Sequence, residues 1–372
     1  MLGLIPVENS DPLVALRGFL RHLLESGLVE ALYLPLEIDG GAVVPALVVD
    51  PEQVAHANPL APAMSINGAR AVSALTRKRT PARLAVVLRP CELRAFIELV
   101  KLQQASLEDV TLISLDCPGT FEWTDFIEIQ RSGNLDLTGY LDAGSRGEVL
   151  ASPALRIACQ MCTHPIPGQV NIHLRLFGAD LTKGIPIELD EGIADLLEMV
   201  EVEEVNPAGR ESIVNSLLAK HEQARKNELE QMQARLGADG GFSEVFSSCI
   251  RCYNCSTACP VCYCKNCLFR TSSFDHAPEH YLNSAHLKGA MRLPGDTILF
   301  HLTRLNHMGL SCVSCGMCTS ACPSEIPVGV VFSLIGGQVQ RVFDYLPGRD
   351  VNEPLPLITF QINEWTEVGE KK

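Results

Sequence analysis

The sequence lacks any apolar run that approaches the roughly 18–20 residues a helix needs to cross a bilayer. Its first residues, MLGLIPVENSDP, also lack the basic stretch that begins a secretory signal peptide. Basic residues are outnumbered, with 30 Lys and Arg against 44 Asp and Glu and a formal net charge of −14. Because nucleic-acid binding depends on Lys and Arg that neutralise phosphates, we expect a cytoplasmic protein that binds no nucleic acid and does not itself insert into a membrane.

Standard phosphate-binding motifs are also missing. No GxGxxG follows a predicted strand and no GxxxxGK[ST] occurs, so the sequence shows no ordinary dinucleotide or P-loop site. The segment SINGAR, residues 65–70, opens a predicted helix whose backbone N–H groups, with Arg70, could meet a phosphate. An ordinary N-cap followed by a solvated arginine is the favoured explanation of these residues. No group of carboxylates and histidines stands out as a general acid or base, so the catalytic residues are unknown.

Cysteine, in contrast, is abundant. The chain has 15 cysteines, and seven of them fall in CIRCYNCSTACPVCYCKNC, residues 249–267. With no export signal in the sequence, we interpret them as reduced thiols that act as metal ligands or catalysts, and a disulfide scaffold is the less favoured alternative.

Eight cysteines form two copies of a C-x2-C-x2-C-x3-C-P run, which begin at Cys249 and at Cys312. In bacterial ferredoxins, three cysteines of such a run bind one [4Fe–4S] cluster, and the cysteine before the proline binds the other cluster. Structural zinc, the alternative, takes four ligands in two pairs rather than two matching runs of four. We therefore predict two [4Fe–4S] clusters, one held by the first set of thiols (Cys249, Cys252, Cys255 and Cys322) and one by the second set (Cys312, Cys315, Cys318 and Cys259).

The same stretch contains three more thiols, Cys262, Cys264 and Cys267, which follow no standard cluster spacing. They either ligate a further cluster or metal with a fourth ligand from outside, which we slightly favour, or pack as small hydrophobic residues around the clusters. His301 and His307 precede the second run, and their spacing does not place them on one helical face. For both histidines, packing or a hydrogen bond near a cluster is the favoured explanation.

Short apolar runs alternate with helical patterns between residues 40 and 160. We predict strands at residues 42–50, 83–88 and 110–115, and a helix that begins at Cys91. A strand–helix–strand unit with a helix of this length predicts an α/β domain with a parallel or mixed sheet.

The remaining four cysteines follow apolar runs. Cys91 follows residues 83–88, Cys117 follows residues 110–115, and Cys159 and Cys162 follow a third apolar stretch, ALRIA. Since ligands collect at the carboxyl ends of parallel strands, these four thiols, the third set, are predicted to bind a third [4Fe–4S] cluster if the strands are neighbours. Four unrelated buried cysteines are the alternative, and a nucleophilic Cys91 is disfavoured because no His or Asp partner stands beside it.

We divide the chain into four parts. Mixed charge and apolar residues at helical spacing in ESIVNSLLAKHEQARKNELEQMQARL predict a long connector helix, and the glycines of GADGGF predict a break after it. The predicted parts are an α/β domain at 1–205, a helical connector at 206–240, a small α-rich dicluster ferredoxin-like domain at 241–340 and an irregular tail at 341–372.

The segments RPCELRAFIELVKLQ, DCPGTF and CQMC resemble the β-subunit family of coenzyme F-420-reducing hydrogenases and formate dehydrogenases. The two cysteine runs resemble the ferredoxin module fused to that domain, although in the family this module often precedes the flavin domain and here it follows. The resemblance implies a flavin, usually FAD, in the α/β domain beside an iron–sulfur cluster, and it supports the third set because the family uses cysteines of the PC and CxxC type there. Asn67 and Arg70 are then weak candidates for flavin contacts.

These features predict an electron-transfer subunit of a multi-subunit oxidoreductase. Its clusters would exchange single electrons with a catalytic partner, such as a hydrogenase, a formate dehydrogenase or a heterodisulfide-reductase-like protein, and its flavin would exchange an electron pair with a soluble carrier. The alternative is a polyferredoxin-type redox-sensing or binding protein without a flavin. A free-standing dehydrogenase is disfavoured because it needs an acid or base that the sequence does not offer.

Overall fold

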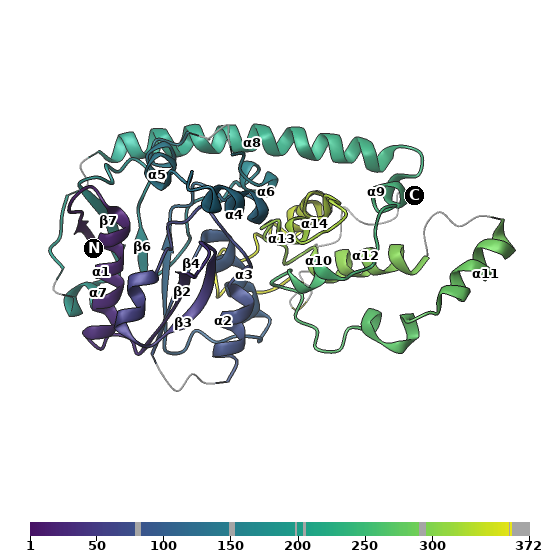
Figure 1. The fold of residues 1–372 in the computed structure, drawn as a ribbon, viewed down its shortest axis with the longest axis horizontal. Helices are drawn as coiled ribbons and strands as arrows, with labels where there is room; N and C mark the ends of the chain where they lie inside the picture. Colours follow the sequence, from purple (N-terminus) through teal and green to yellow (C-terminus); the bar gives the residue numbers. More distant parts are fainter. Residues whose placement is uncertain are drawn as a thin grey trace.

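The computed structural model describes residues 1–78, 83–148, 153–197, 199–203, 206–289, 295–356 and 358. A seven-stranded sheet forms the centre of the N-terminal region (Figure 1), with the order β1-β7-β6-β5-β4-β2-β3. Its strands are β1 (Leu2–Pro6), β2 (Ala31–Glu37), β3 (Val43–Val48), β4 (Leu84–Leu88), β5 (Val110–Leu115), β6 (Ile172–Leu174) and β7 (Gly184–Leu189).

The sheet is mixed. Strands β2, β4, β5 and β6 run parallel as neighbours, while β3 pairs antiparallel with β2 at one edge and β7 pairs antiparallel with β6 and β1 at the other. Helix α3 (Pro90–Lys101) follows β4 and precedes β5, as a crossover between parallel strands requires. The predicted α/β domain with a parallel or mixed sheet is confirmed.

Helices cover both faces of this sheet. All five residues of β4 are buried; Ala85 and Val87 face one core, and Leu84, Val86 and Leu88 face the other, as in a strand covered on both sides. The first face carries the helices α1 (Pro12–Glu25), α4 (Trp123–Arg131) and α5 (Leu137–Ser145), together with η1 (Pro51–His56). The second face carries α2 (Ala69–Thr76) and α3.

The C-terminal region is built of short helices around the cysteine runs. Its apolar residues, such as Phe246, Phe300 and Val331, belong to the same continuous core as α2 and α3. The two regions therefore pack as one body through the second face of the sheet. The remaining elements are α6 (Ile157–Gln160), α7 (Glu191–Leu196), α9 (Gly241–Val245), α10 (Asn254–Thr257), η2 (Leu268–Arg270), η3 (Ser272–Phe274), α11 (Pro278–Lys288), α12 (Gly295–Met308), α13 (Met317–Ser320) and α14 (Val328–Val342).

A single helix of 31 residues, α8 (Pro207–Gly237), lies along both regions (Figure 1). It begins where the Asn206 side chain accepts a hydrogen bond from the Gly209 N–H, with Pro207 in the first turn. Near this end, Arg210 donates two hydrogen bonds to the buried Asp116 carboxylate, at 2.5 and 3.0 Å. A helix thus occupies the predicted connector, while the predicted domain boundaries stay predictions.

The start of the predicted tail packs back on the α/β region. Helix α14 continues to Val342, and beyond it the Tyr345 hydroxyl and the Gly348 N–H both donate to Glu98 of α3, at 2.5 and 2.8 Å. Residues 357 and 359–372 lie outside the described part of the chain.

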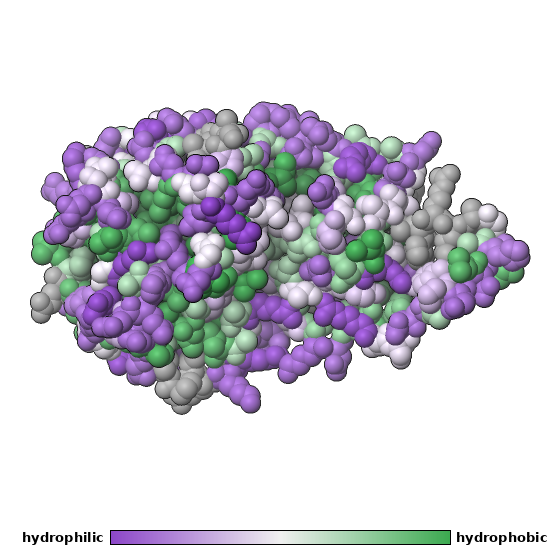
Figure 2. Space-filling view, in the orientation of Figure 1, coloured by the Kyte–Doolittle hydropathy of each residue, from purple (hydrophilic) through white to green (hydrophobic). Residues whose placement is uncertain are grey.

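The surface visible in Figure 2 is largely hydrophilic, with apolar residues in scattered groups. In the described ranges, no helix is both long enough and apolar enough to span a membrane.

One local prediction is wrong. The apolar stretch ALRIA, residues 154–158, is not a strand: Leu155 forms only an isolated bridge with Phe121, and the chain then turns into α6. The parallel strand that pairs with β5 on the side away from β4 is instead β6, which has only three residues. A segment this short, with His173 at its centre, gives almost no periodic signal.

Candidate metal centres

The first set of thiols lines one small cavity of about 20 Å³, formed by the loop before α10, by α10 itself and by the end of the second cysteine run. Arg251 and Tyr253 adopt left-handed backbone angles, with φ of 56° and 61°, and so turn the loop between the cysteines. Helices α10 and α13 lie against each other. Cys322, the last cysteine of the second run, therefore lies beside the cysteines of the first run. The structure brings together Cys249, Cys252, Cys255 and Cys322.

Burial raises the pKa of Cys255 to about 11, and the neighbouring Cys249 and Cys322 add to the rise. A buried thiol of this kind stays protonated until a metal displaces the proton. His301 lies within hydrogen-bond distance of this set, with its Nε2 atom 3.4 Å from the Cys249 sulfur. The set therefore offers four ligands and one polar side chain beside them.

The second set also comes together. Burial raises the pKa of Cys315 to about 12, with further increases from the nearby Cys259 and Cys312. Burial raises the pKa of Cys318 well above its usual value, and Cys259 again contributes. Cys259, the cysteine before the proline of the first run, thus lies among the three thiols of the second run, in the exchange that a dicluster ferredoxin motif requires.

All four thiols of the third set line a single cavity of about 260 Å³. Cys91 lies in the first turn of α3 and Cys117 follows β5, and because β4 and β5 are parallel neighbours these two thiols meet at one sheet edge. Cys159 lies on α6 and Cys162 follows it. The sequence thus identified four thiols that meet, although α6 rather than a third strand delivers two of them.

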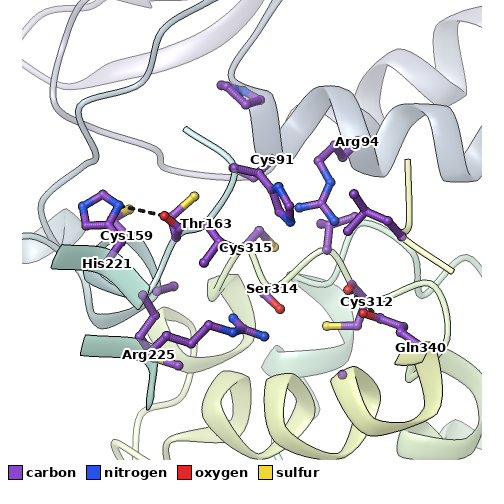
Figure 3. A pocket seen from close by; sticks show the side chains of 18 of the residues that line it. Cys91, Arg94, Cys159, Thr163, His221, Arg225, Cys312, Ser314, Cys315 and Gln340 are labelled. Carbon is purple, nitrogen blue, oxygen red and sulfur yellow. Dashed lines mark hydrogen bonds between the residues drawn. The ribbon is translucent and has the colours of Figure 1, made fainter. Parts of the chain in front are cut away.

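The third set adjoins the second set. Cys312 and Cys315 line the same cavity as Cys91 (Figure 3). After burial, Cys315 is the group that most raises the pKa of Cys91. The cavity therefore has third-set thiols on the α/β side and second-set thiols on the C-terminal side.

Four arginines surround the third set. Arg89 donates from Nη1 to the Cys117 sulfur at 3.4 Å, and Arg156 donates from Nη2 to the Cys159 sulfur at 3.6 Å. Arg94 of α3 and Arg225 of α8 point into the cavity from opposite sides (Figure 3). In the described part of the chain, none of the four forms an ion pair with a carboxylate.

Buried cations without counter-charges are unfavourable. Burial lowers the pKa of Arg94 and of Arg225, and thiols such as Cys162 and Cys312 act against that lowering more strongly than the one carboxylate named for Arg94, Glu98. Yet burial also raises the pKa of Cys162 to about 12, so this thiol is neutral unless it binds a metal. The arginines thus favour an occupant that keeps the thiols ionised.

Cys159 is the exception within the third set. Burial acts to raise the pKa of its thiol, but Arg156 and hydrogen bonds from Thr120 outweigh burial and lower that pKa. A thiolate is the metal-binding form of cysteine. Four thiols with four unpaired arginines around them fit an anionic cluster bound by four thiolates.

His221 adds a further polar group to this cavity. It lies on α8 with 3% of its surface exposed, and its Nδ1 atom is 2.7 Å from the Cys162 carbonyl. Its Nε2 atom is buried without a hydrogen-bond partner. Sequence reasoning missed His221 and the four arginines. The contacts of His221 with Cys162 and of Arg89 with Cys117 join elements far apart in the chain, whereas Arg156, three residues before Cys159, carried a local signal.

The remaining sequence candidates lie elsewhere. Cys262 neighbours Cys259, Cys264 and Cys267, and burial raises its pKa to about 11, whereas Cys264 is exposed. Their role stays a prediction. His307 is exposed and lies away from the thiol contacts that His301 makes.

The SINGAR segment joins the two regions. Asn67 accepts a hydrogen bond from the Ala69 N–H, and Arg70 donates to the Thr257 carbonyl of α10 at 2.9 Å. Neither residue lines the cavity of the third set. A flavin role for Asn67 and Arg70 stays a prediction.

Among the residues described, no group of three or more His, Cys, Asp or Glu side chains converges closely enough to hold a single metal ion. A [4Fe–4S] cluster differs from a single ion in that its thiolates surround a body of eight atoms.

A family model described as a 4Fe-4S dicluster domain matches residues 244–326. The β-subunit of F420-dependent formate dehydrogenase from Methanocaldococcus jannaschii is 26% identical over 75% of this chain and 77% of its own length. The β-subunit of F420-dependent formate dehydrogenase 1 from Methanococcus maripaludis is 27% identical over 94% of this chain and 96% of its own.

A chain in the solved structure of the xenon-derivatised F420-reducing [NiFe] hydrogenase complex from Methanosarcina barkeri is 12% identical. It covers 62% of this chain and 92% of its own length, with a TM-score of 0.44. The curated relatives confirm the resemblance inferred from the cysteine segments, and they do not favour the alternative of a redox-sensing protein outside an oxidoreductase.

Proposed function

We propose that the chain is the electron-transfer subunit of a multi-subunit oxidoreductase, with three [4Fe–4S] clusters and a flavin. The first and second sets each hold one ferredoxin-type cluster, and the third set holds a cluster within the α/β region. Single electrons pass between a catalytic partner and the flavin through these clusters. We place this exchange in the cytoplasm, where cysteines stay reduced.

The shared cavity of the second and third sets is the observation that carries this proposal. Cys312 and Cys315 on one side and Cys91 and Cys162 on the other line a single space. Clusters bound by the second and third sets are consecutive carriers on one electron-transfer route. The first set extends this route, because the contact between α10 and α13 brings it next to the second set. Arg94, which neighbours thiols of both sets, compensates the negative charge that the two clusters bring together.

The flavin is supported by the family resemblance and by a second, larger cavity. This cavity, of about 780 Å³, lies along β5, β6 and β7 and falls in the size range of cofactor sites. Arg349 lines both cavities, which supports a ligand site in the larger one next to the cavity of the third set. We propose this cavity for FAD, which joins single electrons from the clusters into a pair.

The partner and the carrier follow from the relatives. Both curated relatives are named as β-subunits of F420-dependent formate dehydrogenases. We therefore propose a formate dehydrogenase catalytic subunit, or the corresponding hydrogenase subunit, as the partner that exchanges electrons with the clusters. Coenzyme F420 is the proposed soluble carrier that exchanges a pair with the flavin.

The test is a cofactor inventory of the chain purified without oxygen. Iron, acid-labile sulfide, zinc and flavin are measured per chain, and we expect about twelve irons, one flavin and little zinc. About eight irons would leave the third set as packing, and more than twelve would bring Cys262, Cys264 and Cys267 into ligation. Absence of flavin would favour the polyferredoxin-type alternative, and zinc in place of iron would contradict the electron-transfer function.

A further inference from the structure

Arg304 is buried between the two ferredoxin-type sets of thiols. It lies on α12, in the segment that separates the two cysteine runs, and only 4% of its surface is exposed. Its Nη2 atom donates to the Cys255 carbonyl at 3.1 Å, while Nε and Nη1 are buried without a hydrogen-bond partner. The guanidinium stands 4.8 Å from the ring centre of Phe332 and 5.6 Å from that of Phe300.

This position leaves a cation in an apolar shell. Within the described ranges, no carboxylate forms an ion pair with Arg304. An isolated charge is strongly disfavoured in such surroundings unless an opposite charge lies nearby. The side chain therefore identifies a place where negative charge is expected, and the nearest source is the thiols.

The thiols near Arg304 come from both sets. On one side, Arg304 donates to the Cys255 carbonyl of the first set. On the other side it stands over Phe332 of α14, and Gly329 of the same helix lies beside the Cys318 sulfur of the second set. In keeping with this position, burial acts to lower the pKa of Arg304, but the thiols of Cys255, Cys259 and Cys318 outweigh burial and leave that pKa above its usual value. Cys255 belongs to the first set, whereas Cys259 and Cys318 belong to the second. One cation thus faces ligands of both clusters.

His301 lies one helical turn before Arg304 and reaches only the first set. Its ring stacks on Phe246 at 3.9 Å between centres, and its Nε2 atom is 3.4 Å from the Cys249 sulfur. Its Nδ1 atom is buried without a partner. Among the described residues, the Cys249 sulfur is therefore the hydrogen-bond acceptor for an N–H on Nε2. Helix α12 thus presents one polar side chain to the first set alone and one to both sets.

We propose that α12 sets the redox potentials of the ferredoxin-type clusters, with Arg304 raising the potentials of both clusters and His301 raising that of the first cluster alone. Reduction adds one electron, and hence one negative charge, to a cluster. A buried cation stabilises that charge, and a hydrogen bond to a ligating sulfur does the same. This inference rests on the proposed function, since it requires clusters in both sets. Arg304 and His301 are positioning residues in this account, because each acts through the cluster.

The experiment compares variants of the full chain loaded with iron and sulfide without oxygen. Arg304→Gln removes the charge but keeps a donor for the Cys255 carbonyl, and Arg304→Lys restores the charge. His301→Phe keeps the stack on Phe246 and removes the hydrogen bond. The matched controls are Arg235→Gln on α8 and His307→Phe on α12, since both residues are exposed. Midpoint potentials are read from the reduced-cluster EPR signals during a redox titration.

For Arg304→Gln we expect the ratio of reduced to oxidised cluster at a fixed potential to fall about tenfold or more for both clusters. A tenfold change corresponds to a shift of about 59 mV for a one-electron couple. Arg304→Lys should recover most of that shift, and His301→Phe should lower the potential of one cluster only. The two control variants should match the unmodified chain.

If Arg304 only holds the Cys255 carbonyl, Arg304→Gln leaves both potentials unchanged while iron stays bound, and the inference is wrong. If Arg304→Gln loses its iron, His301→Phe decides: potentials of both clusters equal to those of the unmodified chain in His301→Phe contradict the proposal. Iron content near zero in the unmodified chain would instead contradict the proposed function itself.

Discussion

The ferredoxin-type sets and the third set use the same four-thiol chemistry but are built in different ways. The first and second sets come from two local runs that start at Cys249 and Cys312, and each run carries three ligands of its cluster within seven residues. The third set gathers thiols from a helix start, a strand end and a short helix, spread from Cys91 to Cys162. A local run identifies its cofactor from spacing alone, whereas a site assembled by the sheet requires the fold.

The two kinds of site also differ in their charge. Arg304 lies beside the ferredoxin-type sets, whereas Arg89 and Arg156 donate to sulfurs of the third set. Arg94 and Arg225 lie in the cavity that the third set shares with the second, so positive charge is densest at the third set. A higher density of positive charge favours the reduced, more negative state of a cluster. The difference therefore suits a route in which electrons move towards the α/β region.

The largest expected effect comes from removing one thiol of the third set. Cys117→Ser should cost one whole cluster, about four irons per chain, and leave the EPR signals of both ferredoxin-type clusters in place. Iron and sulfide analysis with EPR measures both. Ser132→Ala, at an exposed serine of the α/β region, is the control. Equal iron in Cys117→Ser and the unmodified chain would show that the third set binds no cluster.

The next effect concerns the ion pair that joins α8 to the α/β region. Asp116 has a fully buried side chain that binds Arg210 and His173, at 2.5 and 2.8 Å. Asp116→Asn leaves Arg210 without its counter-charge and should lower the free energy of unfolding by about 3–5 kcal/mol, measured by denaturant titration. Asp142→Asn, at an exposed pair with Arg146, should change it by at most about 1 kcal/mol.

The same pair predicts a pH dependence. Burial acts to raise the pKa of Asp116, but hydrogen bonds from His173 and Arg210 outweigh burial and leave that pKa below its usual value. A carboxylate with a lowered pKa contributes stability above its unfolded pKa of about 3.9, and that contribution is lost as the pH falls through the lower folded value. Asp116→Asn should flatten this acid limb, and an unchanged limb would count against the pair.

A smaller effect is expected when the third set loses an arginine. Arg156 is 4% exposed and donates to both Thr120 and the Cys159 sulfur. Hydrogen bonds to charged groups contribute about 1.5–3 kcal/mol, so Arg156→Met should speed iron loss to a chelator from the third set by at least tenfold. Release from the first set should not change. Arg146→Met, at an exposed arginine, is the control, and equal release in both variants would contradict the role of charge.

The smallest effect is expected at Arg70, which joins the two regions by one exposed hydrogen bond to Thr257. Arg70→Ala should lower the free energy of unfolding by at most about 1 kcal/mol and leave flavin content unchanged. Loss of flavin without loss of stability would show instead that Arg70 contacts the cofactor.

The sequence allowed the central α/β unit to be predicted because β4 and β5 are continuous apolar runs and α3 between them has clear helical spacing. The sheet edges could not be predicted as readily: β6 has three residues, and β1 and β7 pair across nearly the whole region. The apolar stretch 154–158 misled because a short run of buried residues does not distinguish a strand from a loop that enters a helix.

The candidate metal centres, like the fold, could be predicted from the sequence only in part. Spacing predicted which thiols form the first and second sets, and strand ends predicted that Cys91 and Cys117 meet. Spacing could not reveal Arg225, His221 or Arg304 as neighbours of the thiols, since α8 and α12 bring them in from other parts of the chain. Arg156, three residues before Cys159, is the local exception. Local patterns identify ligands, and long-range packing supplies the charges around them.

The most direct test of the central claim is a crystal structure of the chain prepared without oxygen, with the iron atoms located by anomalous scattering. We expect three iron sites: one in each ferredoxin-type set and a third in the cavity of Cys91, Cys117, Cys159 and Cys162. Iron in the two ferredoxin-type sets alone, or a third iron site at Cys262, Cys264 and Cys267 instead, would contradict it.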